Sequence, residues 1–264
     1  MVSFTKTWVS VACASAVLVS VVGRPAQSAS PSTAPAELVS TLEAIEAAAN
    51  AQDLEQLMAL YGSDFAGPDG FTRDQYQSTL GQFWEQYATL TYDVELLSWE
   101  DEGTALVAET LTTINGARQM AGREMQLTAA VRSRQRYENG QLISQEILSE
   151  QNRLTSGDMP PEVTVQLPET IAPGREFNFD AIVEAPLGDR LLLGLAFDEG
   201  VTPEDFLTPR PVDLEALSAG GLFKIGTAPE KPDQRWISAV VVREDGIVID
   251  TRRLFVESEA SAIR

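Results

Sequence analysis

The chain has 264 residues, of which 44% are hydrophobic and 22% are charged, a composition typical of a globular protein and not of a disordered chain. Its formal net charge of -20 disfavours nucleic acid and anionic membrane surfaces, so neither is expected as a partner. The chain has no histidine, which excludes Ser-His-Asp and Cys-His catalysis and histidine-ligated metals. No metal and no cofactor are expected.

Residues 1–28 are typical of a secretory signal peptide. An apolar run follows the early cation Lys6, and a small-residue cleavage pattern ends at Ser28. The run is short for spanning a bilayer, but an uncleaved membrane anchor stays open as the alternative. The only cysteine, Cys13, would leave with the signal, so the mature chain is expected to lack disulfides. We expect an exported protein in the periplasm, the envelope lumen or the extracellular space, with no membrane contact after cleavage.

Three helices are predicted in the next part of the chain. Residues 29–35 are expected to be a low-complexity tether, and structure is expected to begin at residue 36. The first apolar helical face is formed by Leu38, Leu42, Ile45 and Ala49. Asp53 is suited to cap a short second helix. A capping box that begins at Thr72 opens a third helix. The aromatic residues on one face of this helix are Tyr76, Phe83, Trp84 and Tyr87.

The hydrophobic period then changes to that of β-strands. Residues 89–99 alternate apolar and polar side chains, and residues 103–114 are rich in threonine, valine and leucine. Two longer runs, 124–138 and 141–154, are joined at Asn139-Gly140, a strong hairpin signal. We therefore predict an α+β domain over residues 36–154, with three helices on one face of a curved four-stranded antiparallel sheet.

A second domain is predicted after a linker that contains glycine and proline, residues 155–162. Several short strands indicate a small all-β, sandwich-like domain over residues 163–257, followed by a tail at 258–264. Residues 202–221 interrupt these strands and are expected to form a loop with one or two helical turns. Pairing across a turn at Asp245-Gly246 would place Trp236 beside Phe255.

The N-terminal half resembles the NTF2-like superfamily, which includes SnoaL-like polyketide cyclases, ketosteroid isomerases and scytalone dehydratases. ANAQDLEQLMALYGSDF is similar to the helix-turn-helix entry of that family, and RYENGQLISQEILS is similar to its closing hairpin. The resemblance implies a cone-shaped fold around a pocket.

The family's catalytic groups carry over poorly. The positions of the isomerase tyrosine and of its protonated aspartate hold Ile45 and Ser133. The general-base aspartate has one possible counterpart, Asp69. The histidine on which the dehydratases and cyclases depend is absent from this chain.

The two faces of the Asn139-Gly140 hairpin are predicted to differ. A two-residue turn pairs Tyr137 with Leu142 and Ser133 with Glu146 on the more apolar face, which should lie against the helices. We expect this face and the helices to line a ligand pocket with Tyr61, Tyr76, Trp84, Tyr87, Ser133, Gln135, Glu146 and Glu150. The alternative is that these polar groups bond to one another and that the aromatic residues are ordinary core.

The opposite face carries Arg132, Arg134 and Arg136. They could form a solvated strand face whose guanidinium groups pair with nearby acids. They could instead form an interface, either with the C-terminal domain or in a homodimer, because guanidinium groups bind carboxylates in a bidentate manner. A dedicated anion site is the third alternative.

Three functions stay open at this point. The favoured one is a non-catalytic protein that binds a small apolar ligand or mediates assembly, since the family's catalytic groups are missing. A carboxylate-based isomerase, dehydratase or cyclase would use Asp69 or Glu146 as acid or base. The third is an envelope interaction module that acts through the C-terminal β domain, for which an exposed apolar patch would be the sign.

Overall fold

The computed structural model describes residues 28–184, 191–202, 213–217 and 220–258. The predicted signal peptide except its last residue, most of the predicted tail and much of the segment 202–221 lie outside these residues. Among the described residues, no helix has both the length and the apolar character needed to cross a membrane.

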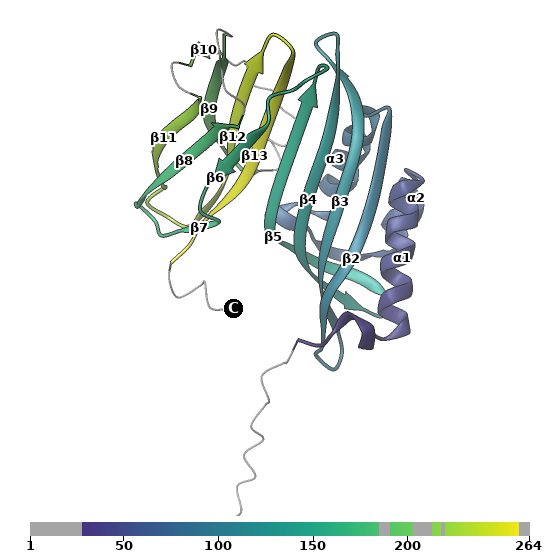
Figure 1. The fold of residues 1–264 in the computed structure, drawn as a ribbon. Coiled ribbons are helices and arrows are strands. Elements are labelled where there is room, and N and C mark those ends of the chain that lie inside the picture. The colour runs from purple at the N-terminus through teal and green to yellow at the C-terminus, as the bar shows by residue number, and fades with distance from the viewer. Residues whose placement is uncertain (1–27, 185–190, 203–212, 218–219, 259–264) are drawn as a thin grey trace, which may run out of the picture.

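The predicted α+β class is wrong, because the structure is mostly β, with 57% strand and 19% helix. The described residues contain three α-helices, α1 (Ala36–Asn50), α2 (Leu54–Ala59) and α3 (Arg73–Glu85). The expected four-stranded sheet is only part of a ten-stranded sheet, which continues into the C-terminal half (Figure 1). The chain is therefore not a cone of three helices on its own curved sheet followed by a separate sandwich.

The helices begin where their capping residues predict. The side chain of Asp53 accepts a hydrogen bond from the backbone N–H of Gln56 at 2.9 Å, at the start of α2. Thr72 and Gln75 form a reciprocal capping box at the start of α3. Leu38 and Leu42 of α1 are buried, as the apolar face predicts.

Most of the remaining described residues form β-strands. The N-terminal half contains β1 (Tyr61–Ala66), β2 (Thr89–Asp101), β3 (Leu106–Met120), β4 (Arg123–Glu138) and β5 (Gln141–Ser156). The C-terminal half contains β6 (Val163–Gln166), β7 (Thr170–Ile171), β8 (Glu176–Val183), β9 (Leu193–Gly200), β10 (Glu215–Ala216), β11 (Gly221–Thr227), β12 (Asp233–Arg243) and β13 (Gly246–Val256).

The ten-stranded sheet joins the two halves edge to edge. Its strand order is β10-β9-β12-β13-β5-β4-β3-β2, with β1 and β7 added as short parallel partners. The seam is the antiparallel pairing of β5 with β13, from Ile247 opposite Ser156 to Arg252 opposite Gln151. An unpaired strand edge exposes backbone donors and acceptors, and this pairing satisfies them within one chain.

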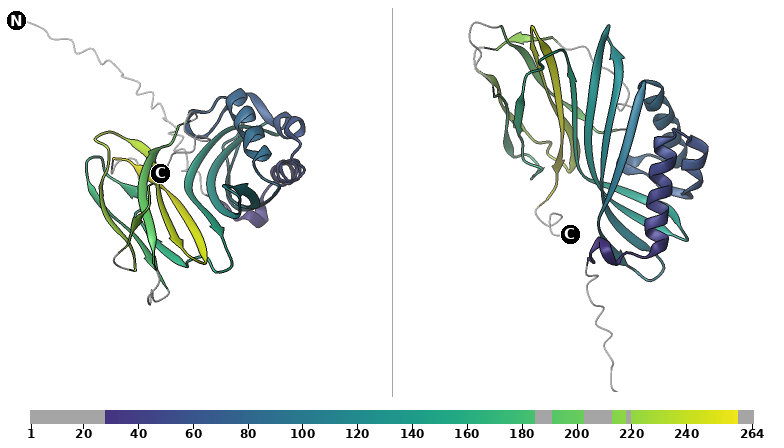
Figure 2. Two further views of the ribbon diagram at one scale, coloured as in Figure 1. Left: turned by 90° about the horizontal axis from the view of Figure 1, so that it is seen from above. Right: turned by 45° about the vertical axis from the view of Figure 1, so that its right-hand side comes forward.

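A second, three-stranded sheet has the order β11-β8-β6 and covers the C-terminal half of the large sheet on the face opposite the helices (Figure 2). Successive side chains of β12 point alternately to the two faces of the large sheet. Ile237 and Ala239 belong to a core shared with Phe179 of β8, whereas Trp236 and Ser238 face the helix side, where they line a cavity. The large sheet is therefore the middle layer between the helices and the small sheet.

The segment predicted as a tether lies along β2. The backbone of Ala29 bonds to that of Trp99, with N···O distances of 2.8 and 3.2 Å, and a short 3-10 helix, η1 (Pro31–Thr33), follows. The indole N–H of Trp99 donates to the hydroxyl of Thr33 at 3.1 Å. These contacts fix the entry to α1 at the edge of the sheet.

Candidate functional site

A cavity of about 980 Å³ lies between the helices and the sheet. It is lined by all three helices, by β2 to β5, and by β9, β12 and β13, so both halves of the chain contribute to it. Its apolar lining includes Leu42, Leu57, Leu80, Phe83, Ile114, Leu127, Ala129 and Ile147. Cavities of this size and composition are typical of small-molecule sites.

The four aromatic residues predicted to line a pocket do line this cavity: Tyr61, Tyr76, Trp84 and Tyr87. The rings of Tyr61 and Tyr76 are stacked with centroids 5.7 Å apart. Burial raises the pKa of Tyr61, helped by its proximity to Tyr76, and burial also raises that of Tyr76. Both phenols therefore stay neutral at physiological pH and offer O–H groups at the cavity wall.

Ser133 and Gln135 belong to a buried hydrogen-bond network within the sheet. The hydroxyl of Ser133 accepts from the amides of Gln135 at 3.2 Å and of Gln145 at 3.3 Å, and lies 3.2 Å from the hydroxyl of Thr110. Tyr137 donates to the side-chain oxygen of Gln135 at 2.5 Å. Gln135 and Gln145 line the cavity, whereas Ser133 is fully buried behind them. These polar groups largely satisfy one another.

Glu146 does not lie where the hairpin arithmetic predicted. Tyr137 does pair with Leu142, but a register shift follows at once, and Glu146 pairs with Arg134 on the outer face, where it is exposed. The physical reason is a β-bulge, which inserts one residue and turns the following side chains to the opposite face. A second shift farther along places Glu150 opposite Val131, on the cavity side.

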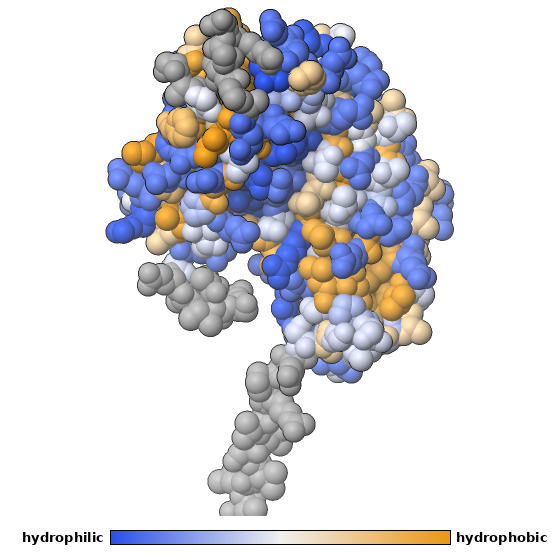
Figure 3. Space-filling view, in the orientation of Figure 1, coloured by the Kyte–Doolittle hydropathy of each residue, from blue (hydrophilic) through white to orange (hydrophobic). Residues whose placement is uncertain are grey.

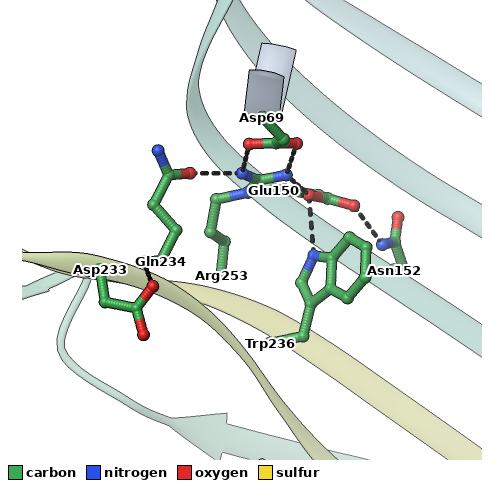
Figure 4. Close-up of polar contacts among 7 residues, drawn as sticks. All are labelled: Asp69, Glu150, Asn152, Asp233, Gln234, Trp236 and Arg253. Carbon is green, nitrogen blue, oxygen red and sulfur yellow. Dashed lines mark hydrogen bonds and ion pairs between the residues drawn. The ribbon is translucent and has the colours of Figure 1, made fainter. Parts of the chain in front are cut away.

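Arg253 of β13 is the centre of a buried charged cluster at the cavity (Figure 4). Its Nη1 and Nη2 donate to the two carboxylate oxygens of Asp69, at 2.6 and 3.0 Å. Its Nε and Nη2 donate to Oε2 of Glu150, at 2.9 and 2.5 Å. Nη1 also donates to Gln234, at 2.5 Å, and the indole of Trp236 donates to Glu150 at 3.1 Å. All five guanidinium N–H groups thus have acceptors.

The charges of this cluster do not balance, since one cation faces two carboxylates. The side chains of Arg253, Asp69 and Glu150 are 1%, 6% and 10% exposed. Burial disfavours the charged guanidinium, but hydrogen bonds and attraction from Asp69 and Glu150 outweigh that effect and raise the pKa of Arg253. The arginine therefore carries its charge under all ordinary conditions.

Asp69 reaches Arg253 from the short 3-10 helix η2 (Pro68–Gly70), which precedes α3. Its backbone has φ of 58°, in the left-handed region that aspartate tolerates better than most residues. The two bonds to Arg253 hold a side chain from the N-terminal half against a strand from the C-terminal half.

Sequence reasoning identified Asp69 and Glu150 as candidates but missed Arg253 and Trp236. The predicted hairpin register placed Trp236 beside Phe255, whereas the structure pairs Trp236 with Arg253. The local signal for a buried ion pair was weak, because Arg253 follows another arginine, Arg252, and only the residues after it, Leu254 to Val256, are apolar.

The three outer-face arginines pair with acids on their own face of the sheet. Arg132 bonds Glu109, Arg134 bonds Glu100 at 3.3 Å, and Arg136 bonds Glu102 and Glu138. The arginine side chains are 33% to 49% exposed. This outer face is toward the viewer in Figure 3, where a group of hydrophobic residues at the lower right lies beside hydrophilic ones. A homodimer through this face stays a prediction.

Metal binding has no candidate site in the part of the chain that the structure describes, because no three acidic or thiol side chains there are arranged to hold an ion. Two of the carboxylates that line the cavity, Asp69 and Glu150, are paired with Arg253.

Residues 158–257 match a protein family described as "Domain of unknown function (DUF8623)". No curated protein matches the sequence. The family match covers the C-terminal half and assigns no activity.

Several solved structures are similar to part of the chain. Bd1075 of Bdellovibrio bacteriovorus is 15% identical, with a TM-score of 0.32, over 42% of this chain and 38% of its own. A putative scytalone dehydratase from Novosphingobium aromaticivorans is 14% identical, with a TM-score of 0.36, over 42% and 80%. An uncharacterized cystatin-fold protein from the same organism is 15% identical, with a TM-score of 0.33, over 44% and 99%. These are low-identity similarities over less than half of the chain, and they assign it no activity.

Proposed function

We propose that this is an exported protein that binds a small, largely apolar molecule in the cavity and does not transform it chemically. The observation that carries the proposal is the cavity itself, about 980 Å³, with apolar and aromatic side chains from both halves of the chain around it. A domain with a purely structural role would fill such a space with side chains, because protein interiors are close-packed.

The state of the carboxylates supports a binding role over acid-base chemistry. Asp69 accepts two bonds from Arg253, and Oε2 of Glu150 accepts three, two from Arg253 and one from Trp236. Oε1 of Glu150 accepts from Asn152 at 2.6 Å. A general base needs a free lone pair within reach of the substrate proton. The remaining candidate, Glu146, is exposed on the opposite face.

Titration of the mature protein with Nile red, a neutral dye whose emission shifts to the blue in apolar surroundings, tests the proposal. We expect saturable binding of one dye per chain with a clear blue shift. Emission that rises linearly without saturation, or that stays at its value in water, would contradict a ligand-binding cavity.

A second measurement tests whether the protein converts its ligand. The protein is incubated with a ligand that displaces Nile red, and the mass of the recovered ligand is measured by mass spectrometry. We expect it unchanged in mass and in chromatographic retention. Conversion that Glu150→Gln abolishes would support the carboxylate-enzyme alternative.

A further inference from the structure

Two arginines, Arg118 and Arg253, are among the described residues that line the cavity, and their bonding states differ. Arg253 is saturated, since each of its five N–H donors has an acceptor and two carboxylates neutralise it. It therefore has no donor left for a ligand. Arg118 is the other cation at this wall.

Arg118 lies near the end of β3 and bonds only to neutral groups. Its Nη1 donates to the side-chain oxygen of Gln86 at 2.8 Å, and its Nη2 contacts the sulfur of Met120 at 3.6 Å, a weak acceptor. Its Nε is buried without a hydrogen-bond partner. Within the described ranges of the chain it makes no ion pair.

The position of this guanidinium is fixed by an aromatic ring of the cavity. Its central carbon is 5.3 Å from the ring centroid of Tyr87, a cation–π geometry. Tyr87 is itself buried and packs against Phe83, with centroids 4.8 Å apart. Unpartnered Nε atoms also occur at Arg73 and Arg235, so this atom alone does not set Arg118 apart. Arg118 differs because it lines the cavity and has no carboxylate partner among the described residues.

We propose that the ligand of this cavity is an apolar carboxylic acid, whose carboxylate is bound by Arg118 while its apolar part occupies the space between the helices and the sheet. This inference rests on the proposed function and names the ligand class for the same cavity. Guanidinium groups bind carboxylates through two parallel N–H···O bonds, and the two Nη groups, each with two N–H donors and one recorded contact, provide that fork. The acidic side chain of α3 that also lines this wall, Glu85, is exposed, so solvent screens its repulsion.

The test compares three ligands with one ten-carbon chain and different head groups: decanoate, decanol and decylamine. Each displaces Nile red from the mature protein at pH 7.5. We expect decanoate to bind at least about 10-fold more tightly than decanol, a difference of about 1.4 kcal/mol, because charge-assisted hydrogen bonds are stronger than neutral ones. Equal affinities, or tightest binding of decylamine, would overturn the proposal.

The matched variants are Arg118→Gln and Arg123→Gln, which remove the same charge from the two arms of one hairpin. Arg123 is exposed and is not among the described residues that line the cavity. We expect Arg118→Gln to bring the ratio of decanoate to decanol affinity close to one, and Arg123→Gln to leave this ratio at its value in the unmodified protein. Equal losses in both variants would show a general charge effect and overturn the assignment to Arg118.

Arg118→Lys keeps the charge without the fork, and we expect it to retain only part of the preference for decanoate. The comparison in the unmodified protein needs no variant, so it decides the question even if Arg118→Gln folds poorly. Failure of Nile red to bind the unmodified protein would instead refute the proposed function, an outcome distinct from equal displacement by all three ligands.

Discussion

Arg253 of β13 donates to a single oxygen of Glu150 on β5, from Nε at 2.9 Å and from Nη2 at 2.5 Å, across the seam that joins the two halves of the chain. On the opposite face of the same seam the charges are reversed. There Arg153 of β5 donates to Asp250 of β13 at 2.9 and 2.7 Å. The seam is thus stabilised by two ion pairs, one on each face of the sheet. In one the arginine belongs to β13, and in the other it belongs to β5.

Removal of Arg253 is expected to destabilise the protein strongly. Arg253→Ala leaves Asp69 and Glu150 buried without their cation, and breaking a buried pair from one side costs about 3–5 kcal/mol. Urea unfolding followed by tryptophan fluorescence measures the loss. The matched control is Arg132→Ala, which breaks a surface pair of an arginine that is 49% exposed and is expected to cost less than about 1 kcal/mol. Equal losses in the two variants would refute a dominant role for the buried cluster.

Two glutamates four residues apart on β5 are expected to behave differently. Glu150→Gln weakens the bonds to Arg253 and Trp236 and should lower the free energy of unfolding by about 1–3 kcal/mol. Glu146→Gln alters an exposed side chain and should change it by less than about 0.5 kcal/mol. The same urea titrations measure both variants. A large effect of Glu146→Gln would mean that the bulge does not turn this residue outward.

The tyrosines predict a particular response to alkaline pH. The chain has five tyrosines, and burial raises the pKa of all of them above 10.0: Tyr61, Tyr76, Tyr87, Tyr92 and Tyr137. Because the folded pKa is raised, the unfolded state ionises first, so stability is fully present below pH 10 and falls as the pH rises above it.

Absorbance at 295 nm, which follows tyrosinate, checks this expectation. At pH 10 the native protein should show almost no tyrosinate, while the protein in concentrated guanidinium chloride should be about half ionised, as unperturbed tyrosines are. A native titration with a midpoint at the ordinary value would contradict the burial of these phenols.

Local patterns in the sequence predicted local structure well. The caps at Asp53 and Thr72 and the Asn139-Gly140 turn form as predicted because each depends on contacts within a few residues. Helical periodicity placed Tyr76, Trp84 and Tyr87 on one face, and all three line the cavity, whereas Tyr61 reaches it from strand β1.

What the sequence could not predict depends on register and on long-range pairing. The bulges in the hairpin moved Glu146 to the outer face, and no residue type marks them in advance. The seam joins β5 to β13, about a hundred positions away, so strand pattern alone could not exclude two separate domains. The predicted fold class was wrong for this reason. For the same reason Arg253, the partner of Asp69 and Glu150, was not predicted.

The most direct test of the ligand-binding account compares the same substitution on two adjacent residues of β4. Ala129 is buried at the cavity wall, whereas Ala130 points to the outer face. Nile red titration of Ala129→Phe and Ala130→Phe is the measurement, with circular dichroism to confirm that both variants are folded. The account predicts that Ala129→Phe weakens dye binding by about 10-fold or more, since losing roughly 1.4 kcal/mol of contact has that effect, while Ala130→Phe binds as the unmodified protein does. Equal binding by the two folded variants would contradict a ligand site in this cavity.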